Sequence, residues 1–239
     1  LEQALESIRP ASEQAMEQAW AHWNDLALPL HSLGRLQDTV VRIAGMTRTP
    51  QVTLGKKALV VMCADNGVVE EGVTQSGQEV TRIVAENFLQ EKATAAILCK
   101  KAGADIFPVD IGIAADSKII NRKIAYGTKN MAKEPAMTRQ EVKKALEVGI
   151  AMAEELKEKG YGIIATGEMG IGNTTTSSAV TSVLLEEDPA KVTGRGAGLT
   201  SAGLEKKIEV IRKAIQLHQP EKEDVLDVLS KVGGLDIAG

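Results

Sequence analysis

The stretch Tyr161-Gly-Ile-Ile-Ala-Thr-Gly-Glu-Met-Gly-Ile-Gly-Asn-Thr-Thr-Thr-Ser177 decides the fold of this chain. It opens with a short apolar run, Ile163 to Ala165, of the kind that a buried parallel strand needs. Glycines at 167, 170 and 172 then break the run, and a helix is expected to start near Thr174. This order of strand, glycine turn and helix start directs free backbone N–H groups and the positive end of a helix dipole to one point.

An anion is the expected occupant of this turn, because glycines let the backbone approach a ligand with no Cβ in the way. No Gly-Lys-Ser/Thr follows, so the turn is not a nucleoside-triphosphate P-loop. The glycine spacing alone is a weak signal, and a turn without any ligand is the alternative. Glu168, which we expect inside the loop, favours a ligand: a carboxylate there is useful if it contacts sugar hydroxyls or a developing positive charge.

The composition is that of a globular protein with an aliphatic core. Hydrophobic residues make up 44% of the 239 residues and aromatic residues only 3%, in a chain long enough for a sizeable core. The net charge of −4 argues against nucleic acid as a partner. Two cysteines indicate no disulfide framework, and the sequence shows neither a signal peptide nor an apolar run of transmembrane length. We therefore expect a cytoplasmic protein that does not bind membranes.

Hydrophobic periodicity predicts strands that alternate with helices after an N-terminal helical part, joined by a linker at Thr49-Pro50. The capping box Thr138-Arg-Gln-Glu141 is the strongest local signal. The predicted helices are 1–23 with an interruption at Pro10, 32–45 capped by Ser32 and closed at Gly45, 79–101, 138–160, 174–185, 204–215 and 222–232, and the predicted strands are 59–64, 106–111 and 163–165. This order predicts an α/β fold with a parallel sheet covered by helices.

Three polar loops, 65–78, 167–177 and 193–200, are expected to lie at one edge of this sheet, since each can follow a strand. Ligands bind at the carboxyl edge of such sheets. Asp65 leaves its strand directly, and Gln75, Ser76 and Gln78 offer uncharged hydrogen-bonding groups. An ordinary solvated connection is the alternative for loop 65–78, although loops of this length are usually functional or disordered.

No cysteine and histidine cluster suggests a metal site, and the three histidines lie outside the loops, where they form no Ser-His-Asp arrangement. We therefore expect chemistry that needs no metal or cofactor and depends on carboxylates and dipoles.

Six motifs in this order resemble the nicotinate-nucleotide–dimethylbenzimidazole phosphoribosyltransferases of cobamide lower-ligand synthesis, over nearly the whole chain. The motifs are Ser32-Leu-Gly-Arg35, Ala64-Asp-Asn-Gly-Val68, Gln78-Glu-Val-Thr81, Gly127-Thr128 with Pro135-Ala-Met-Thr138, Gly167-Glu-Met-Gly-Ile-Gly-Asn-Thr-Thr175 and Gly194-Arg-Gly-Ala-Gly-Leu199. Each motif alone is weak, but the combination is highly specific.

The resemblance implies an enzyme that moves the phosphoribosyl group of nicotinate mononucleotide to an aromatic lower-ligand base, giving nicotinate and an α-riboside phosphate. It implies a Rossmann-like α/β domain over 52–218. A small helical domain would combine residues 1–48 with C-terminal elements that start at 219–239. The chain begins at Leu1 without Met and stops soon after Gly233, so we expect it to be incomplete. The family also implies a homodimer.

The resemblance also implies roles for individual residues, according to their positions in these motifs. The phosphate ligands would be Gly170, Ile171, Gly172, Asn173 and Thr174, with Lys207 as charge partner. The nicotinate ligands would be Gly194, Arg195, Gly196 and Gly198, and the lower-ligand base would contact Asp65, Gln75, Ser76 and Gln78. Glu168 would lie near the ribose, where positive charge builds in the transition state.

Two departures from the family pattern stand out. The general base of the family is a glutamate near the C-terminus, beyond Gly239, so no residue here takes that role. Many members also read Asp-His-Gly where this chain has Asp65-Asn66-Gly67, which leaves the lower-ligand base open among benzimidazoles, purines and phenolic compounds.

Two rival interpretations remain. A noncatalytic subunit that binds nucleotide would lack the glutamate entirely. A dinucleotide-binding oxidoreductase needs an acidic residue about 20 positions after the glycine loop. Glu186 and Glu187 fall near there, but they look like the end of a helix and not of a strand, so this interpretation ranks low.

Overall fold

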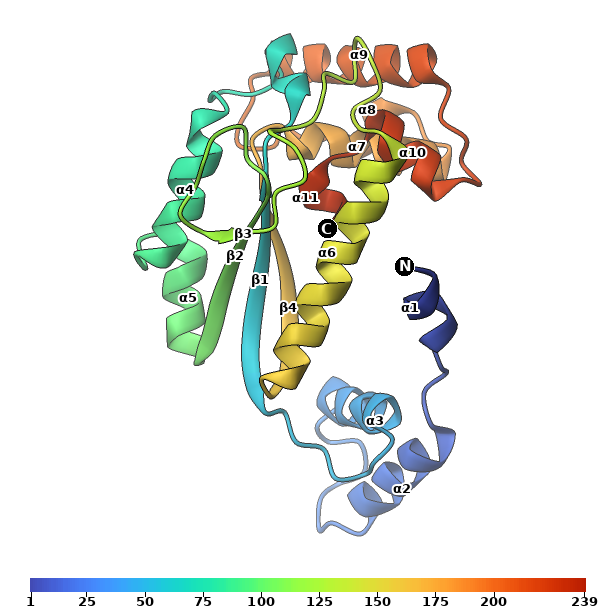
Figure 1. Ribbon diagram of the computed structural model, residues 1–239. Coiled ribbons are helices and arrows are strands. Elements are labelled where there is room, and N and C mark those ends of the chain that lie inside the picture. Colours follow the sequence, from blue (N-terminus) through green and yellow to red (C-terminus); the bar gives the residue numbers. More distant parts are fainter. The chain divides into compact units, whose positions relative to one another are not determined.

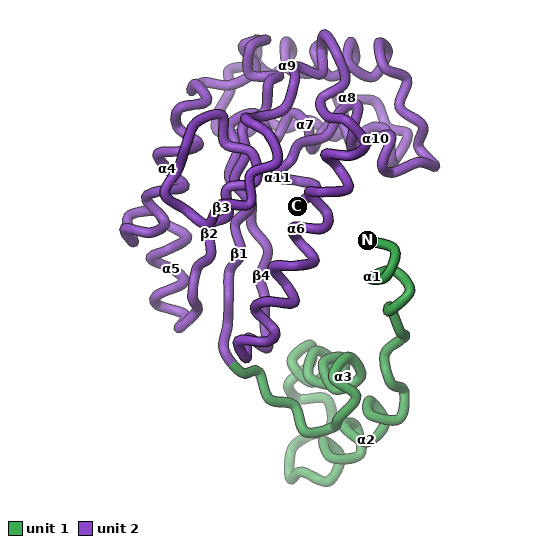
Figure 2. Tube along the Cα trace, in the orientation of Figure 1, with its two compact units in different colours: residues 1–55 green, residues 56–239 purple.

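The computed structural model describes residues 1–239, which form two compact units, 1–55 and 56–239 (Figure 2). None of the helices combines the length and the apolar character that a membrane span requires.

The N-terminal unit contains three helices, α1 (Glu2–Ser7), α2 (Glu13–Asn24) and α3 (Arg35–Thr47). The interruption predicted at Pro10 is confirmed, and Ser12 caps α2 by accepting a hydrogen bond from the amide of Ala15. The boundaries predicted for the next helix are wrong. Gly34, and not Ser32, is the N-cap of α3, and the helix continues through Gly45. A Cβ on Gly45 would lie 2.7 Å from Cγ of Met16, so this glycine allows close packing of α2 on α3 and does not end a helix.

The second unit contains a parallel sheet of four strands, β1 (Lys56–Ala64), β2 (Ala104–Gly112), β3 (Ile120–Asn121) and β4 (Tyr161–Met169). Their order is β3-β2-β1-β4, so that β1 lies in the middle (Figure 1). This confirms the predicted fold class. The carboxyl ends of β1, β2 and β4 lie at the same edge, and the site is built there.

Successive side chains of β1 supply the two faces of the core. Val61 and Cys63 pack in one cluster with Phe88 of α4 (Glu79–Leu89) and Ala96 of α5 (Thr94–Ala102). These two helices cover one face of the sheet, and α6 (Arg139–Glu158) covers the other (Figure 1). The single helix predicted over 79–101 is therefore two helices. The break falls at residues 90–93, where Glu91 adopts a left-handed φ of +54°.

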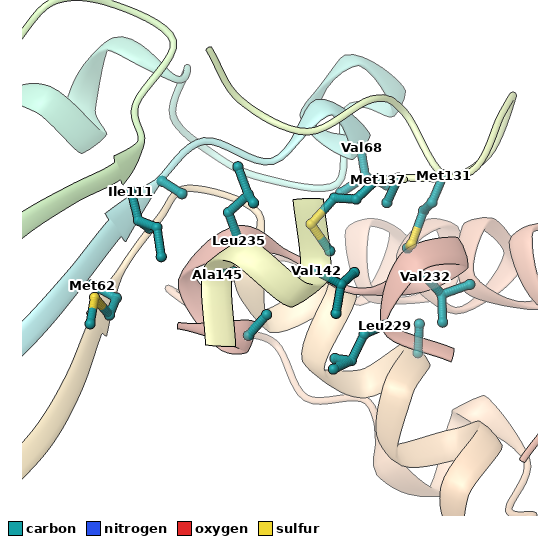
Figure 3. Close-up of a cluster of buried hydrophobic side chains, with 14 of the residues drawn as sticks. Met62, Val68, Ile111, Met131, Met137, Val142, Ala145, Leu229, Val232 and Leu235 are labelled. Carbon is teal, nitrogen blue, oxygen red and sulfur yellow. The ribbon is translucent and has the colours of Figure 1, made fainter. Parts of the chain in front are cut away.

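Helix α6 begins as the sequence predicts. Thr138 Oγ1 accepts from the amide of Glu141, and Glu141 Oε2 accepts from the amide of Thr138. Its apolar side packs against the C-terminal helices, and Figure 3 shows part of this core around Val142, Ala145 and Leu229.

The remaining helices follow β1 or β4. They are the short 3-10 helix η1 (Gly67–Glu71), α7 (Asn173–Leu185), α8 (Pro189–Val192), α9 (Ser201–His218), α10 (Val225–Val232) and α11 (Leu235–Ala238). Glu186 and Glu187 lie just past the end of α7, as predicted. Helix α11 was not predicted. It packs at the carboxyl ends of the strands, where a Cβ on Gly112 would overlap the side chain of Leu235.

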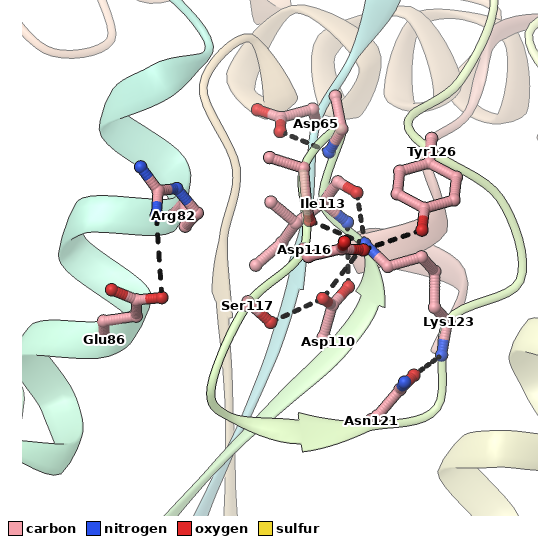
Figure 4. A network of polar contacts seen from close by, with 12 residues as sticks. Asp65, Arg82, Glu86, Asp110, Ile113, Asp116, Ser117, Asn121, Lys123 and Tyr126 are labelled. Atoms are coloured by element: carbon pink, nitrogen blue, oxygen red, sulfur yellow. Dashed lines mark hydrogen bonds and ion pairs between the residues drawn. The ribbon is translucent and has the colours of Figure 1, made fainter.

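A polar network fixes the connection that leaves β2 (Figure 4). Asp110 forms an ion pair with Lys123 at 3.0 Å and accepts hydrogen bonds from the amide of Ile113 and the hydroxyl of Ser117. The amide of Ala114 donates to Asp65 at the end of β1, over 2.8 Å. The ends of the two central strands are therefore tied together beside the site.

Candidate active site

Strand β4 ends later than the sequence predicts. Gly167 does not break the strand, because its backbone remains in register with Val61 of β1. Glu168 therefore lies in the strand, opposite Met62, and not in the loop. The glycine turn starts at Gly170, which places the carboxylate of Glu168 on a rigid element directly before the turn.

The turn leads into α7 in the expected way. Gly172 has a φ of +95°, which an L-residue rarely adopts, and α7 begins at Asn173. The amides of Asn173 and Thr175 donate to carbonyls within the turn, at Gly170 and Gly172. The amides of Gly172 and Thr174 donate to no atom of the chain. Two free N–H groups at the positive end of a helix dipole form a geometry that suits an anion.

The polar loops line one cavity of about 270 Å³. Its walls come from residues 73–76 after β1, residues 168–174 after β4, and the 195–199 region with Lys207 of α9. We expected from the sequence that loop 193–200 could follow a strand, and this is wrong. It follows α8, a single helical turn that begins with Pro189, and it reaches the cavity because α9 packs on α7.

Lys207 is a buried cation in this cavity. The side chain is 1% exposed, and its Nζ donates to Thr174 Oγ1 at 2.7 Å and to the carbonyl of Gly194 at 3.2 Å. No carboxylate pairs with it. Burial lowers the pKa of the Lys207 ammonium below its ordinary value. A bound anion would supply the missing countercharge.

The loop of residues 194–199 folds back on itself. The guanidinium of Arg195 donates to the carbonyl of Leu199 and to the hydroxyl of Ser201. Gln75 donates from the opposite loop to the carbonyl of Gly198. The amides of Gly196 and Ala197 donate to no atom of the chain, so two free backbone N–H groups lie in the cavity lining together with Thr174.

Only two of the four residues assigned to the lower-ligand base line this cavity. Gln75 and Ser76 line the cavity, whereas Asp65 and Gln78 do not. Asp65 is 2% exposed; burial raises the pKa of its carboxyl, and the hydrogen bond from Ala114 opposes that shift. Gln78 donates to the carbonyl of Asn66 and contributes to a second cavity, of about 600 Å³, between η1 and residues 125–137.

Three further residues at the site were given no role from the sequence. Thr81 accepts a hydrogen bond from the amide of Ile171 at 3.0 Å and so fixes the glycine turn to α4. Asn66 is completely buried and donates to Asp236 Oδ2 at 3.3 Å. Thr81 and Asn66 stand inside recognisable motifs, but Asp236 has no local pattern that could have identified it.

Comparisons with known proteins show which family the chain belongs to. A family model described as phosphoribosyltransferase matches residues 8–239. A nicotinate-nucleotide–dimethylbenzimidazole phosphoribosyltransferase of Clostridium tetani is 48% identical over 100% of this chain and 67% of its own length. One of the same name from Acetivibrio thermocellus is 47% identical over 99% of the chain and 68% of its own length.

A crystal structure of CobT from Thermus thermophilus superposes with a TM-score of 0.87 at 35% identity, covering 94% of this chain and 68% of that one. The chain thus spans about two thirds of the length of these relatives. The shared fold, the matching family model and the identity over the whole chain establish that this chain belongs to the nicotinate-nucleotide–dimethylbenzimidazole phosphoribosyltransferase family.

Proposed function

We propose that the chain forms the nucleotide site of an enzyme that transfers the phosphoribosyl group of nicotinate mononucleotide to an aromatic lower-ligand base. The products are nicotinate and an α-riboside phosphate for cobamide biosynthesis. The observation that carries the assignment is the buried Lys207, which has no acidic partner and lies in one cavity with the free amides of Gly172 and Thr174. A monophosphate supplies the charge and the acceptors that these groups lack.

In this proposal the phosphate binds at residues 170–174 and Lys207, and the nicotinate carboxylate binds at the free amides of Gly196 and Ala197. The ribose then lies between the two loops, within reach of Glu168. Arg195 shapes the nicotinate loop through its hydrogen bonds to Leu199 and Ser201.

The reaction balances without a cofactor. The bond between the ribose C1′ and the pyridinium nitrogen breaks, and its electron pair neutralises the nicotinate ring. A nitrogen of the lower-ligand base forms the new bond to C1′, and the base loses its N–H proton. Positive charge moves onto the ribose in the transition state, where the Glu168 carboxylate stabilises it. The proton requires a general base, typically worth about 10² to 10⁴ in rate.

We assign that general base to the family glutamate that lies beyond position 239 in longer members. Gln75 and Ser76 are the groups that would contact the lower-ligand base in this cavity. Asn66 lies buried outside the cavity wall, so its difference from the histidine of other members is expected to affect the shape of the site more than direct contact with the base.

Two measurements test the function. Isothermal calorimetry should detect binding of nicotinate mononucleotide to the chain, with little binding of nicotinamide mononucleotide, which lacks the nicotinate carboxylate. Chromatography should detect nicotinate and α-riboside phosphate in equal amounts with 5,6-dimethylbenzimidazole as acceptor, in a form extended to the length of its relatives. Absence of both binding and transfer would overturn the proposal.

We also propose that the protein acts as a homodimer. Helices α4 and α5 cover one face of the sheet, and large apolar side chains on them are exposed to solvent, with Ile83, Leu89, Ile97 and Leu98 each 48–60% exposed. A second copy would bury them. Light scattering should give twice the chain mass, and I97K with L98K should give the monomer mass; a monomeric wild type would contradict the proposal.

A further inference from the structure

A buried hydroxyl lies where the glycine turn meets helix α4. The buried positions of this helix are Thr81, Ala85 and Phe88, and the last two pack in one apolar cluster with Cys63 of β1. The side chain of Thr81 is 0% exposed. A buried hydroxyl costs free energy unless it forms a hydrogen bond, whereas a valine of the same shape would carry no such cost. A threonine at this position therefore indicates a polar partner nearby.

The partner is a backbone amide of the glycine turn. The N–H of Ile171 donates to Thr81 Oγ1 over 3.0 Å, although the two residues lie 90 positions apart in the sequence. The next amide along the turn, that of Gly172, donates to no atom of the chain, and Gly172 lines the cavity of about 270 Å³. Consecutive amides of one turn thus have different uses. The protein holds the first, and the second is available to a ligand.

Helix α4 is itself fixed at this end. Its N-cap residue, Gln78, donates from Nε2 to the carbonyl of Asn66 over 3.1 Å, and the Thr81 amide donates to the carbonyl of Gln78 over 3.0 Å. Asn66 follows the end of β1 and is completely buried. The first turn of α4, and with it the Thr81 hydroxyl, is therefore fixed to the carboxyl end of the central strand. Gln78, which does not line the cavity, has a structural role in this arrangement.

Close packing also holds the turn. A Cβ on Gly170 would lie 2.3 Å from the carbonyl oxygen of Ala64, and a Cβ on Gly172 would lie 2.8 Å from Cγ2 of Val69. Such packing limits how near the turn lies to β1 and to η1. It does not determine how the peptide groups rotate, because van der Waals contacts have no preferred direction, whereas hydrogen bonds do. The contact with Thr81 therefore supplies the directional restraint on this part of the turn.

We propose that Thr81 is a positioning residue for nucleotide binding, which holds the N–H of Ile171 and so orients the turn with the amide of Gly172 toward the phosphate. This inference rests on the proposed function and extends it from the groups that touch the nucleotide to a group behind them. Glu168 is oriented separately, because it is held by the pairing of β4 with β1 and accepts a hydrogen bond from Asn173. Thr81 should therefore act on nucleotide binding and not on the transfer step.

The test removes only the hydrogen bond. T81V keeps the shape of the side chain but removes the acceptor, and T81S keeps the hydroxyl. Calorimetry should show that T81V binds nicotinate mononucleotide about tenfold more weakly than wild type, which is the scale of one lost hydrogen bond. T81S should bind like wild type. T94V, at an exposed threonine at the start of α5, is the matched control and should also bind like wild type.

Kinetics separate this role from a role in the transfer step. In a form extended to the length of its relatives, T81V should raise KM for nicotinate mononucleotide and leave kcat nearly unchanged, which is the pattern for lost ground-state binding. Equal affinity of T81V and wild type would overturn the proposal. Equal losses in T81V and T81S would also overturn it, because packing and not the hydroxyl would then be responsible.

A second measurement does not need a folded T81V. Nitrogen-15 NMR of the free wild type should show slow hydrogen exchange at the Ile171 amide and fast exchange at Gly172, which nicotinate mononucleotide should then protect. Fast exchange at Ile171 would contradict the proposal. If wild type binds no nicotinate mononucleotide, the proposed function fails and this inference fails with it. If wild type binds and T81V binds equally well, only the inference fails.

Discussion

Lys207 Nζ lies 2.7 Å from Thr174 Oγ1, so that a buried ammonium on α9 contacts the first turn of α7 without any carboxylate between them. Two elements separated by a loop and a short helix therefore converge on one point that carries positive charge from a side chain and from a helix dipole. The free protein therefore holds a buried cation without a countercharge. A bound anion would compensate the free-energy cost of burying that cation.

The first prediction follows from this contact. K207M removes the charge but retains most of the side-chain volume, and it should weaken binding of nicotinate mononucleotide by about tenfold to a hundredfold, as expected for hydrogen bonds to a charged group. Calorimetry measures the change. The neighbouring K206M is the matched control, because Lys206 is exposed and does not line the cavity. Equal affinity in K207M and wild type would show that the phosphate binds elsewhere.

The second prediction concerns the glycine turn. G172A must adopt a φ near +95° and places its Cβ 2.8 Å from Cγ2 of Val69, so we expect weaker nucleotide binding and a loss of stability above about 1 kcal/mol. G160A is the control, since Gly160 also has a positive φ, of +82°, but no atom lies near its Cβ position. Urea unfolding and calorimetry of both variants separate backbone strain from damage to the site. Comparable effects of the two variants on nucleotide affinity would refute a ligand role for the turn.

The third prediction concerns Glu168. E168Q should lower kcat by more than it raises KM, because the carboxylate stabilises charge that develops only in the transition state. Removal of a negative charge beside the phosphate loop should leave nucleotide affinity unchanged or higher. Steady-state kinetics with E158Q, an exposed change at the end of α6, provides the comparison. A raised KM with unchanged kcat would assign Glu168 to ground-state binding instead.

The fourth prediction is a pH dependence of stability. The pKa of Asp236 is about 7 in the folded protein and near 3.8 when unfolded, so the folded state binds the proton more tightly. The free energy of unfolding should therefore fall as pH rises from about 4 to about 7, by up to a few kcal/mol. Urea unfolding at several pH values should show that the stability of D236N does not fall in this way as pH rises. D38N, a change at an exposed site, should follow wild type, and parallel curves for D236N and wild type would disprove the assignment.

The fifth prediction concerns the general base. A chain of residues 1–239 should bind nicotinate mononucleotide but transfer the phosphoribosyl group at least about 10²-fold more slowly than a form extended to the length of its relatives. Turnover of both forms with 5,6-dimethylbenzimidazole measures the ratio. Equal turnover would mean that the base lies within residues 1–239, with Glu168 as the first candidate.

Local signals in the sequence predicted the order of the elements well. The capping box at Thr138 and the apolar run at 59–64 depend on neighbouring residues only, and the helix and the strand that they predict both appear in the structure. Errors arose at glycines and at one helix break. Gly45 and Gly167 look like stop signals, but their positions are determined by packing against Met16 and by pairing with Val61, which only the assembled fold reveals.

The backbone geometry of the candidate site was predictable where one segment contains the glycine turn and the helix start, as in residues 170–174. Lys207 was identified only through the resemblance to a known family, since a lysine in a helix carries no sign that it is buried. Asp236 was not identified, because its burial and its hydrogen bond from Asn66 join residues that lie far apart in the chain. Long-range polar contacts of this kind leave no periodic pattern.

The burial of Cys63 has a practical consequence. Its thiol lies in the central strand, fully buried against Phe88 and Ala96, and burial raises its pKa well above the ordinary value. A thiol reagent can modify it only when the sheet opens, so the modification rate reports the opening equilibrium of β1 directly. Because β1 pairs with β4 up to Met169, one residue before the glycine turn, a nucleotide bound there should slow the modification in proportion to its occupancy. The protein thus contains its own chemical probe for ligand binding.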